Sequence, residues 1–277
     1  MKLGFIGGGN MARALISALL RQGFARDDLS VGEPLEAARE ALRRDFDIRV
    51  EAGNEAAARA DVVVLAVKPQ EMRGVLLALR PTLSQHRPLL LSIAAGIRSE
   101  DLMAWCPGLH AVRAMPNRPA LFGAGATGLF AGAGVSAEER HAAEQVLGAA
   151  GSTVWMRNEA ELDVVTALSG SGPAYFLLLA EQMAAAAVKL GLEESTARQL
   201  AAQTLYGTGL IAHHDPDLAA QRAAVTSRGG TTAAAIASFE QNGLGALVEQ
   251  ALAAAARRSA ELAVTASAAA TNKSHAT

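Results

Sequence analysis

The sequence lacks several features that would define a protein class directly. Its 277 residues include one cysteine, Cys106, so one chain can form neither a disulfide nor a zinc site built from several thiolates, and we predict a reducing compartment. The 25 basic and 27 acidic residues nearly cancel and occur in small groups, which leaves no basic stripe for a nucleic acid backbone. The sequence contains no run of about 18 uninterrupted apolar residues, so we expect no membrane span.

The N-terminal segment does not have the pattern of a signal peptide. Lys2 is the only charge before the apolar stretch, and residues 7–10 and Arg13 interrupt that stretch. We therefore expect a cytoplasmic protein. A hydrophobic fraction of 51% provides for a sizeable core, and 277 residues are enough for two domains of ordinary size.

The sequence changes character near residue 158. Before that point, β-rich runs such as KLGFI, DLSVG, ADVVVLAV and RPLLLSIA alternate with amphipathic segments, which is typical of βαβ units. After it the strands stop, and helices are predicted over 159–168, 173–190, 194–212, 232–241 and 244–266. The predicted fold class is an α/β Rossmann-type domain with a mostly parallel sheet, residues 1–158, followed by an all-α domain, residues 159–277. We expect the last ~10 residues, in the tail SAAATNKSHAT, to be disordered.

One predicted helix is too apolar to be buried completely within a single chain. Pro173 suits its first position and Gly191 suits its end, and the segment between them, AYFLLLAEQMAAAAVKL, is apolar nearly all round. Such a helix must be buried on all sides, and four or five helices cannot enclose it alone. We therefore predict a homo-oligomer.

The first chemical motif is Gly7-Gly8-Gly9-Asn10-Met11-Ala12, between a predicted strand and a predicted helix. Small residues there let the backbone approach a pyrophosphate, which binds to the N–H groups at the start of the helix. A tight turn that needs glycine is the alternative interpretation. The position of the motif in the first βαβ unit favours a dinucleotide site.

The predicted second strand ends near Glu33, about 20 residues after the glycines, where an acidic side chain binds the 2′-hydroxyl of the adenosine ribose. Glu33 therefore favours NADH over NADPH. Arg39, Arg43 and Arg44 follow, and one of them would instead accept a 2′-phosphate, although a solvated helix face is the simpler interpretation.

Two further segments follow predicted strands at the edge where open parallel sheets bind ligands. Asn54 follows the third strand, and Ala66-Val67-Lys68-Pro69-Gln70 follows the fourth. Lys68 is a candidate for the ribose or a phosphate of the cofactor, with an ordinary surface lysine as the alternative.

Six strings occur in a distinctive order: IGGGNMA, AVKPQ, SIAAGI, RAMPNRPA, ALSGSGPAYF and VTSRGGTT. Together they closely resemble the pyrroline-5-carboxylate reductases, from Leu3 to about Glu261. The resemblance implies a two-domain enzyme that reduces the cyclic imine 1-pyrroline-5-carboxylate to L-proline with NADPH or NADH, the final step of proline biosynthesis. It also implies interlocked homodimers that often form larger rings, so the expected assembly is a dimer or a pentamer of dimers, a decamer.

The resemblance carries roles to individual positions. Pro116 lies in the segment that lines the nicotinamide side of the cleft, and Ser171 borders the pocket or simply starts a helix. The predicted cofactor-binding residues are Ile6, Gly7, Gly8, Gly9, Asn10, Met11, Glu33, Asn54, Ala66, Val67, Lys68, Pro69, Ala94, Ala95 and Gly96. The predicted substrate-binding residues are Met115, Asn117, Ser171, Gly229, Gly230, Thr231 and Thr232.

The run Gly229-Gly230-Thr231-Thr232 suits a bound carboxylate. Glycines permit close backbone approach, and N–H groups at the start of the following helix hold an anion. Thr232 is the candidate catalytic residue, since its hydroxyl would bond the ring nitrogen or the carboxylate. If the imine binds already protonated, hydride transfer needs no general acid, and the motifs contain no evident one. A helix stop, a turn and an N-cap threonine explain the same run structurally.

Some features have no assigned role. Arg118 stands where the family commonly has threonine, and Arg228 stands where it often has proline. Either arginine adds positive charge near the substrate, or both are tolerated exchanges in exposed loops. The segment from His213 to Gln221 fits the family pattern poorly. His213 and His214 have no cysteine or carboxylate at ligand spacing, so we predict no metal.

Two other classes remain open. A β-hydroxyacid dehydrogenase-like enzyme would need a catalytic lysine in the helical half, where Lys189 is the only lysine before the tail. A non-catalytic redox sensor would bind the dinucleotide alone, and the intact Gly-Gly-Thr-Thr run argues against it.

Overall fold

The structure, a computed structural model, describes residues 1–272 and forms two compact units. The first unit comprises Met1–Gly170 together with the chain from Ala255 onward, and the second comprises Ser171–Ala254. Residues 159–170 lie with the first unit because helix α6 (Glu161–Val165) packs on strands of the sheet. The expected limit of the functional domains at residue 158 stays a prediction.

The first unit is built on one sheet of eight strands. The strand order is β3-β2-β1-β4-β5-β6-β7-β8, and every neighbouring pair is parallel except β6 and β7. The mostly parallel Rossmann-type sheet predicted from the sequence is therefore confirmed. The strands are β1 (Leu3–Ile6), β2 (Leu29–Gly32), β3 (Arg49–Glu51), β4 (Val62–Leu65), β5 (Leu89–Ser92), β6 (Ala111–Met115), β7 (Gly125–Ala131) and β8 (Gly151–Trp155).

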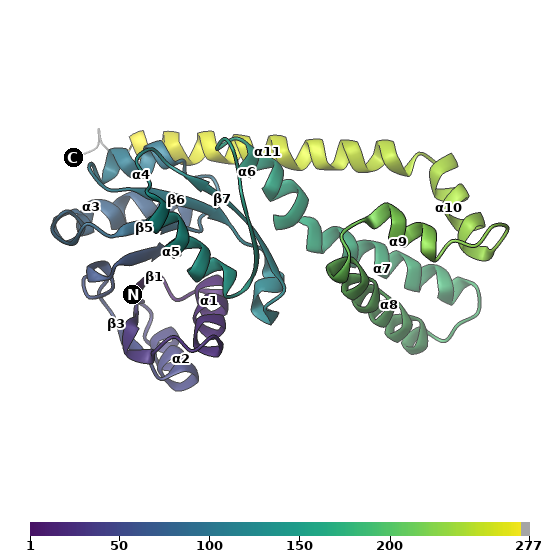
Figure 1. The fold of residues 1–277 in the computed structure, drawn as a ribbon, viewed down its shortest axis with the longest axis horizontal. Coiled ribbons are helices and arrows are strands. Elements are labelled where there is room, and N and C mark those ends of the chain that lie inside the picture. The colour runs from purple at the N-terminus through teal and green to yellow at the C-terminus, as the bar shows by residue number, and fades with distance from the viewer. Residues whose placement is uncertain (273–277) are drawn as a thin grey trace. The chain divides into compact units, whose positions relative to one another are not determined.

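Helices cover both faces of this sheet (Figure 1). Alternate residues of β4 show why: Val62 and Val64 join one buried apolar cluster, whereas Val63 and Leu65 join another. The first cluster includes residues of α1 (Asn10–Arg21), α2 (Glu36–Phe46) and α5 (Ala137–Gly148), and the second includes residues of α3 (Pro69–His86) and α4 (Ser99–Trp105). Three short 3-10 turns complete the unit: Arg26–Asp28, Ala57–Arg59 and Arg118–Phe122.

Helix α3 is longer than its sequence pattern indicates. A proline in a helix interior removes one backbone hydrogen bond, so the sequence predicts that the helix ends before Pro81. The helix instead continues to His86, because Leu76, Leu79 and Leu83 keep one apolar face buried on both sides of the proline. Arg87 then ends the helix in the left-handed conformation.

The second unit is helical. It contains α7 (Gly172–Lys189), α8 (Glu194–His214), α9 (Leu218–Ala224), α10 (Thr231–Gln241) and the first part of α11 (Leu244–Asn272). The sequence did not predict α9, whose signal is Asp217: its carboxylate caps the helix by accepting the Ala220 N–H at 3.0 Å. Helix α11 continues to Asn272, beyond the start of the tail expected to be disordered, and the rest of that tail lies outside the described residues.

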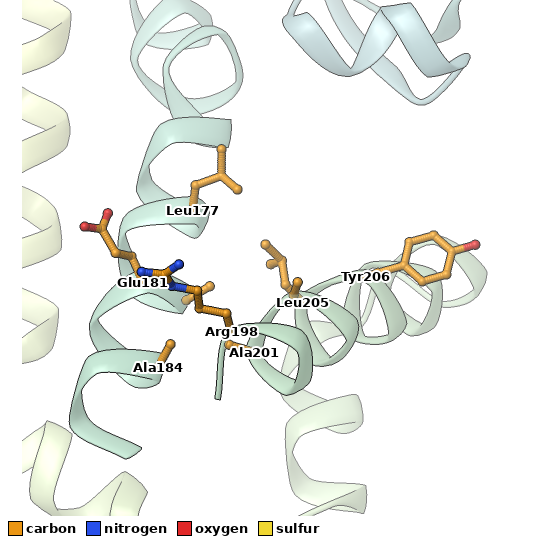
Figure 2. A pocket seen from close by; sticks show the side chains of 9 residues that line it. Leu177, Glu181, Ala184, Arg198, Ala201, Leu205 and Tyr206 are labelled. Atoms are coloured by element: carbon orange, nitrogen blue, oxygen red, sulfur yellow. The ribbon is translucent and has the colours of Figure 1, made fainter. Parts of the chain in front are cut away.

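Helix α7 is largely uncovered within one chain. Phe176 is 63% exposed, and Leu177, Leu178 and Leu179 are also exposed. A groove of about 470 Å³ lies between α7 and α8, and Figure 2 shows Leu177 and Leu205 lining it from the two helices. The uncovered apolar surface agrees with the expectation that one chain cannot enclose this helix.

The same region bears on the expectation that no segment spans a membrane. Within the described residues, one helical run, Glu161–Lys189, is long and apolar enough to cross a membrane by length and composition. Core helices of oligomers pass the same test. In the sequence, Ser-Gly-Ser-Gly before Pro173 interrupts this run, so the sequence does not show it as one apolar stretch.

Candidate functional site

The glycine turn lies at the point where the strand order reverses. β1 pairs with β2 on one side and with β4 on the other, all parallel, so the loops after these strands meet at one edge of the sheet. Gly7 has a φ of 96°, and a Cβ there would lie 2.9 Å from the carbonyl oxygen of Ala66. Any side chain would therefore strain the turn and push the β4 loop away.

The start of α1 is open to a ligand. Gly9 is its N-cap, no side chain caps the helix, and its first turn holds no acidic residue. A Cβ on Gly9 would meet nothing within 4 Å. The first N–H groups of a helix lack partners within the helix and attract anions, so the start of this 12-residue helix has the open donors that the predicted phosphate site requires.

Glu33 follows β2 and is buried, with 8% of its surface exposed. Its carboxylate accepts the Gly8 N–H and the Leu35 N–H, each at 2.9 Å, so both oxygens are fixed by backbone donors. Arg39 stabilises the same loop by donating to the carbonyl oxygens of Glu33 at 2.9 Å and Pro34 at 2.6 Å. The predicted ribose-binding carboxylate thus lies directly against the glycine turn.

Asn54 provides an independent sign of a ligand. Its Oδ1 atom is buried and has no hydrogen-bond partner among the described residues. It lies against Gly32, where an added Cβ would come within 2.2 Å of it. Because buried polar atoms are nearly always satisfied, an acceptor left open at this edge fits a group that binds there and donates a hydrogen bond, as a nucleotide's hydroxyl does. The residues present therefore fit a dinucleotide.

The other predicted cofactor residues follow neighbouring strands. Lys68 is the exposed N-cap residue of α3, directly after β4. Ala94, Ala95 and Gly96 follow β5, which pairs with β4. Gly96 has a φ of 77°, which favours glycine, and a Cβ there would lie 3.4 Å from the Ala263 backbone of α11.

Met115 and Asn117 lie beside an unusual helical turn. Residues Thr166–Gly170 form a π-helical turn, a form found often at functional sites. The Asn117 side chain donates to the Ser169 carbonyl at 3.0 Å and accepts the Ala126 N–H at 2.9 Å. Met115 packs against Gly170, since a Cβ on this glycine would lie 2.7 Å from the Met115 methyl group. Asn117 therefore connects the predicted nicotinamide-side loop to the π-turn.

A buried ion pair supports this region and has no sequence signal. Arg113 of β6 donates to Glu159 at 2.8 Å, and Glu159 also accepts the Ser99 N–H at 2.6 Å and the Ser99 hydroxyl at 2.9 Å. Burial alone would raise the pKa of Glu159, but the Ser99 and Arg113 donors outweigh it and hold that pKa below its usual value. The partners lie 46 and 60 residues from Glu159 in the chain, too far apart for any local pattern.

The predicted substrate loop belongs to the second unit. Gly229 has a φ of 73°, and Gly230 is the N-cap of α10, where an added Cβ would come within 2.4 Å of the Ser227 hydroxyl. No side chain caps α10, and its first turn, which begins with Thr231 and Thr232, contains no acidic residue. The loop therefore presents a second open helix N-terminus.

Several predictions have no test in this geometry. Ser171 is the N-cap residue of α7 and bonds nothing with its side chain in that role. Arg118 and Arg228 are exposed, and nothing in the structure assigns them a function. Among the described residues no three His, Cys, Asp or Glu side chains gather as metal ligands would, and the absence of a metal stays a prediction.

Comparisons with known proteins identify the family. A family model for pyrroline-5-carboxylate reductase dimerisation matches residues 159–262, and one for coenzyme F420-dependent NADP oxidoreductases matches residues 2–96. The chain is 49% identical over 265 residues to the pyrroline-5-carboxylate reductase of Pseudomonas aeruginosa, covering 95% of this chain and 97% of that protein. The chain belongs to the pyrroline-5-carboxylate reductase family.

Solved structures of pyrroline-5-carboxylate reductases agree with this assignment. The enzyme of Coxiella burnetii has a TM-score of 0.90 and 38% identity, covering 94% of this chain and 98% of that one. The Plasmodium falciparum enzyme, solved with NADP bound, has a TM-score of 0.80 and 29% identity, covering 95% and 98%. The resemblance predicted from the six strings is therefore confirmed.

Proposed function

We propose that this chain is an NAD(P)H-dependent pyrroline-5-carboxylate reductase that reduces the cyclic imine 1-pyrroline-5-carboxylate to L-proline, the final step of proline biosynthesis. The observation that carries the proposal is 49% identity to a pyrroline-5-carboxylate reductase over nearly the whole chain. The open α1 N-terminus and the unsatisfied Asn54 oxygen support a dinucleotide at the sheet edge. Membership of this family sets aside a β-hydroxyacid dehydrogenase activity.

The cofactor, when bound, supplies hydride to the imine carbon. The chain's own residues bind and position the two reactants, and the proposed cofactor-binding residues are those at the carboxyl ends of β1, β2, β4 and β5, with the pyrophosphate on the α1 N–H groups. The proposed substrate site uses the α10 N–H groups for the carboxylate and the Thr232 hydroxyl for the ring nitrogen or the carboxylate. Met115, Asn117 and Ser171 are the other proposed substrate-binding residues.

Catalysis would then rest on positioning and electrostatics. A substrate that binds as the protonated iminium leaves the product amine neutral after hydride transfer, so the enzyme needs no general acid in that step. The proposed site residues include no histidine, and Glu33, their one carboxyl group, bonds two backbone N–H groups at the adenosine end. The proposed role of the α10 start is therefore to bind the substrate carboxylate in a fixed position.

An absorbance assay tests the activity. Purified protein is mixed with pyrroline-5-carboxylate and NADH or NADPH at neutral pH, and loss of the reduced nicotinamide is followed together with formation of L-proline. We expect stoichiometric conversion. Binding of a cofactor without oxidation of either one, in a folded preparation, would favour the redox sensor and contradict the proposed reaction.

We also propose that the protein is a cytoplasmic homo-oligomer, a dimer or a pentamer of dimers, that inserts in no membrane. The match to a dimerisation family over 159–262 and the uncovered apolar face of α7 support an assembly that buries this helix. Light scattering after gel filtration without detergent should give the mass of a dimer or a decamer. Leu178→Glu on the exposed face should reduce that mass, and Glu249→Gln on α11 serves as the control. A wild-type monomer, or one that stays in solution only with detergent, would contradict the proposal.

A further inference from the structure

Glu33 and its neighbours bear on which dinucleotide the proposed reductase uses. NADH and NADPH differ only at the adenosine ribose, where one carries a 2′-hydroxyl and the other a 2′-phosphate. A hydroxyl can donate a hydrogen bond to a carboxylate, whereas a phosphate offers acceptors and negative charge. The group that meets this position therefore decides the preference.

The Glu33 carboxylate cannot turn away from that position without losing hydrogen bonds. Its two oxygens accept the Gly8 and Leu35 N–H groups at 2.9 Å, and the residue is 8% exposed. Rotating it aside to admit a phosphate would leave both backbone donors without their partner, at a cost comparable to two hydrogen bonds. The charge is thus fixed beside the glycine turn.

The arginines that would bind a 2′-phosphate are already engaged. Arg39 is almost buried and donates to the carbonyl oxygens of Glu33 and Pro34, and it also pairs with Glu36. Arg43 donates to the Val50 carbonyl at 2.6 Å. Binding a phosphate with either side chain would break these bonds, and moving Arg39 would also release the loop that carries Glu33.

Arg44 and Arg13 are engaged as well. Arg44 bonds Asp45 at 2.9 Å. Arg13 also pairs with Asp45, and its guanidinium lies 5.1 Å from the centre of the Phe46 ring. Both cations share the one Asp45 carboxylate, so binding a phosphate with either of them would compete with that ion pair.

The end of β2 therefore presents acceptors on both of its faces. Glu33 faces Gly8 on one side, and the unpartnered Asn54 oxygen lies against Gly32 on the other. We infer that the fixed Glu33 carboxylate excludes the 2′-phosphate and makes NADH the preferred cofactor of this reductase. The inference rests on the proposed dinucleotide-dependent function and identifies Glu33 as its specificity-determining residue.

Calorimetric titration of the full-length oligomer with NADH and with NADPH tests the inference without turnover. The wild type should bind NADH at least about tenfold more tightly, because a carboxylate beside a 2′-phosphate is repulsive in a partly buried site. Glu33→Gln keeps the shape and one acceptor for Gly8 but removes the charge, so it should reduce the difference to about threefold or less, mainly by tighter NADPH binding. Glu40→Gln removes the same charge from an exposed position of the nearby helix α2 and should leave the ratio unchanged.

Equal or tighter binding of NADPH by the wild type would overturn the inference, as would an unchanged ratio in Glu33→Gln. If that variant does not fold, the ratio of the NADH and NADPH affinities of the wild type decides, and Glu33→Ser replaces Glu33→Gln as the variant that removes the charge. Turnover separates the two proposals. If NADH binds preferentially and pyrroline-5-carboxylate is not reduced, the function fails and the cofactor inference stands. If both cofactors are oxidised and bind equally, the function stands and the inference fails.

Discussion

Replacing Glu159 with glutamine should destabilise the first unit by about 2 kcal/mol, because it leaves the Arg113 charge without its carboxylate partner in a partly buried position. The side chains of Arg113 and Glu159 are 9% and 17% exposed, so solvent screens the pair little. The amide of glutamine has one acceptor where the carboxylate has two, so it cannot serve Arg113 and both Ser99 donors.

Tryptophan fluorescence during urea unfolding provides the assay. The two tryptophans, Trp105 and Trp155, both lie in the first unit, so their emission reports on that unit alone. Glu40→Gln, which removes an exposed carboxylate, should change stability by less than about 0.5 kcal/mol. A loss in Glu159→Gln no larger than in this control would refute the reasoning.

The effect should also depend on pH with a definite sign. The pKa of Glu159 is held below its ordinary value of 4.5 in the folded chain, so the carboxylate stabilises the fold above that value. Its contribution is lost as the pH falls from 4.5 through the lower pKa of the folded state. The difference in unfolding midpoint between wild type and Glu159→Gln should therefore narrow in acid and be constant at neutral pH. A difference that widens in acid would show that the ion pair is not its origin.

Three more predictions follow from the site and its surroundings. Thr232→Ala should lower kcat/KM with nearly unchanged cofactor affinity, and Thr232→Ser should restore much of it; a loss confined to cofactor binding would show that the loop is wrongly assigned. Asn117→Ala leaves the Ser169 carbonyl and the Ala126 N–H unpaired, so it should cost about 1–3 kcal/mol in urea unfolding and also lower kcat; unchanged kcat would limit Asn117 to a structural role. Burial raises the pKa of Cys106 to about 11, so iodoacetamide at pH 8 should label the native protein only after unfolding, and rapid native labelling would contradict the buried position.

The fold was largely predictable because its signals are local. The apolar runs that became β4 and β5 are bounded by loops, and residues two apart face the same side of the sheet, so each strand supplies both cores. The extension of α3 past Pro81 was not predictable from the proline alone, since tertiary burial of Leu83 overrides the local cost. Helix α9 was missed although Asp217 is an ordinary N-cap signal.

The site was predictable only where one short segment carries the chemistry. The glycine turn and the Gly-Gly-Thr-Thr run each place a helix start next to glycines, and this is visible in the sequence. Glu33 was a candidate from its spacing alone, but the contacts of Arg39 needed the structure, because the sequence does not show whether an arginine faces a ligand or its own backbone. The Arg113–Glu159 pair joins distant parts of the chain and has no local pattern.

Some helices of this chain begin with a side-chain cap, and others begin with open N–H groups. α5 is capped by Ser136 and carries two glutamates in its first turn, and α8 is capped by Glu193. α1 and α10 instead begin after Gly9 and Gly230, with no side-chain cap and no acidic residue in the first turn. α7 begins after Ser171 with the same two features, so an open start alone does not identify a ligand site; α1 and α10 differ from it in having glycine at the N-cap. Caps stabilise a helix by about 1 kcal/mol, so leaving such an end open costs stability unless an anion occupies it. In the proposed function, the pyrophosphate of the cofactor binds at the start of α1 and the carboxylate of the substrate binds at the start of α10.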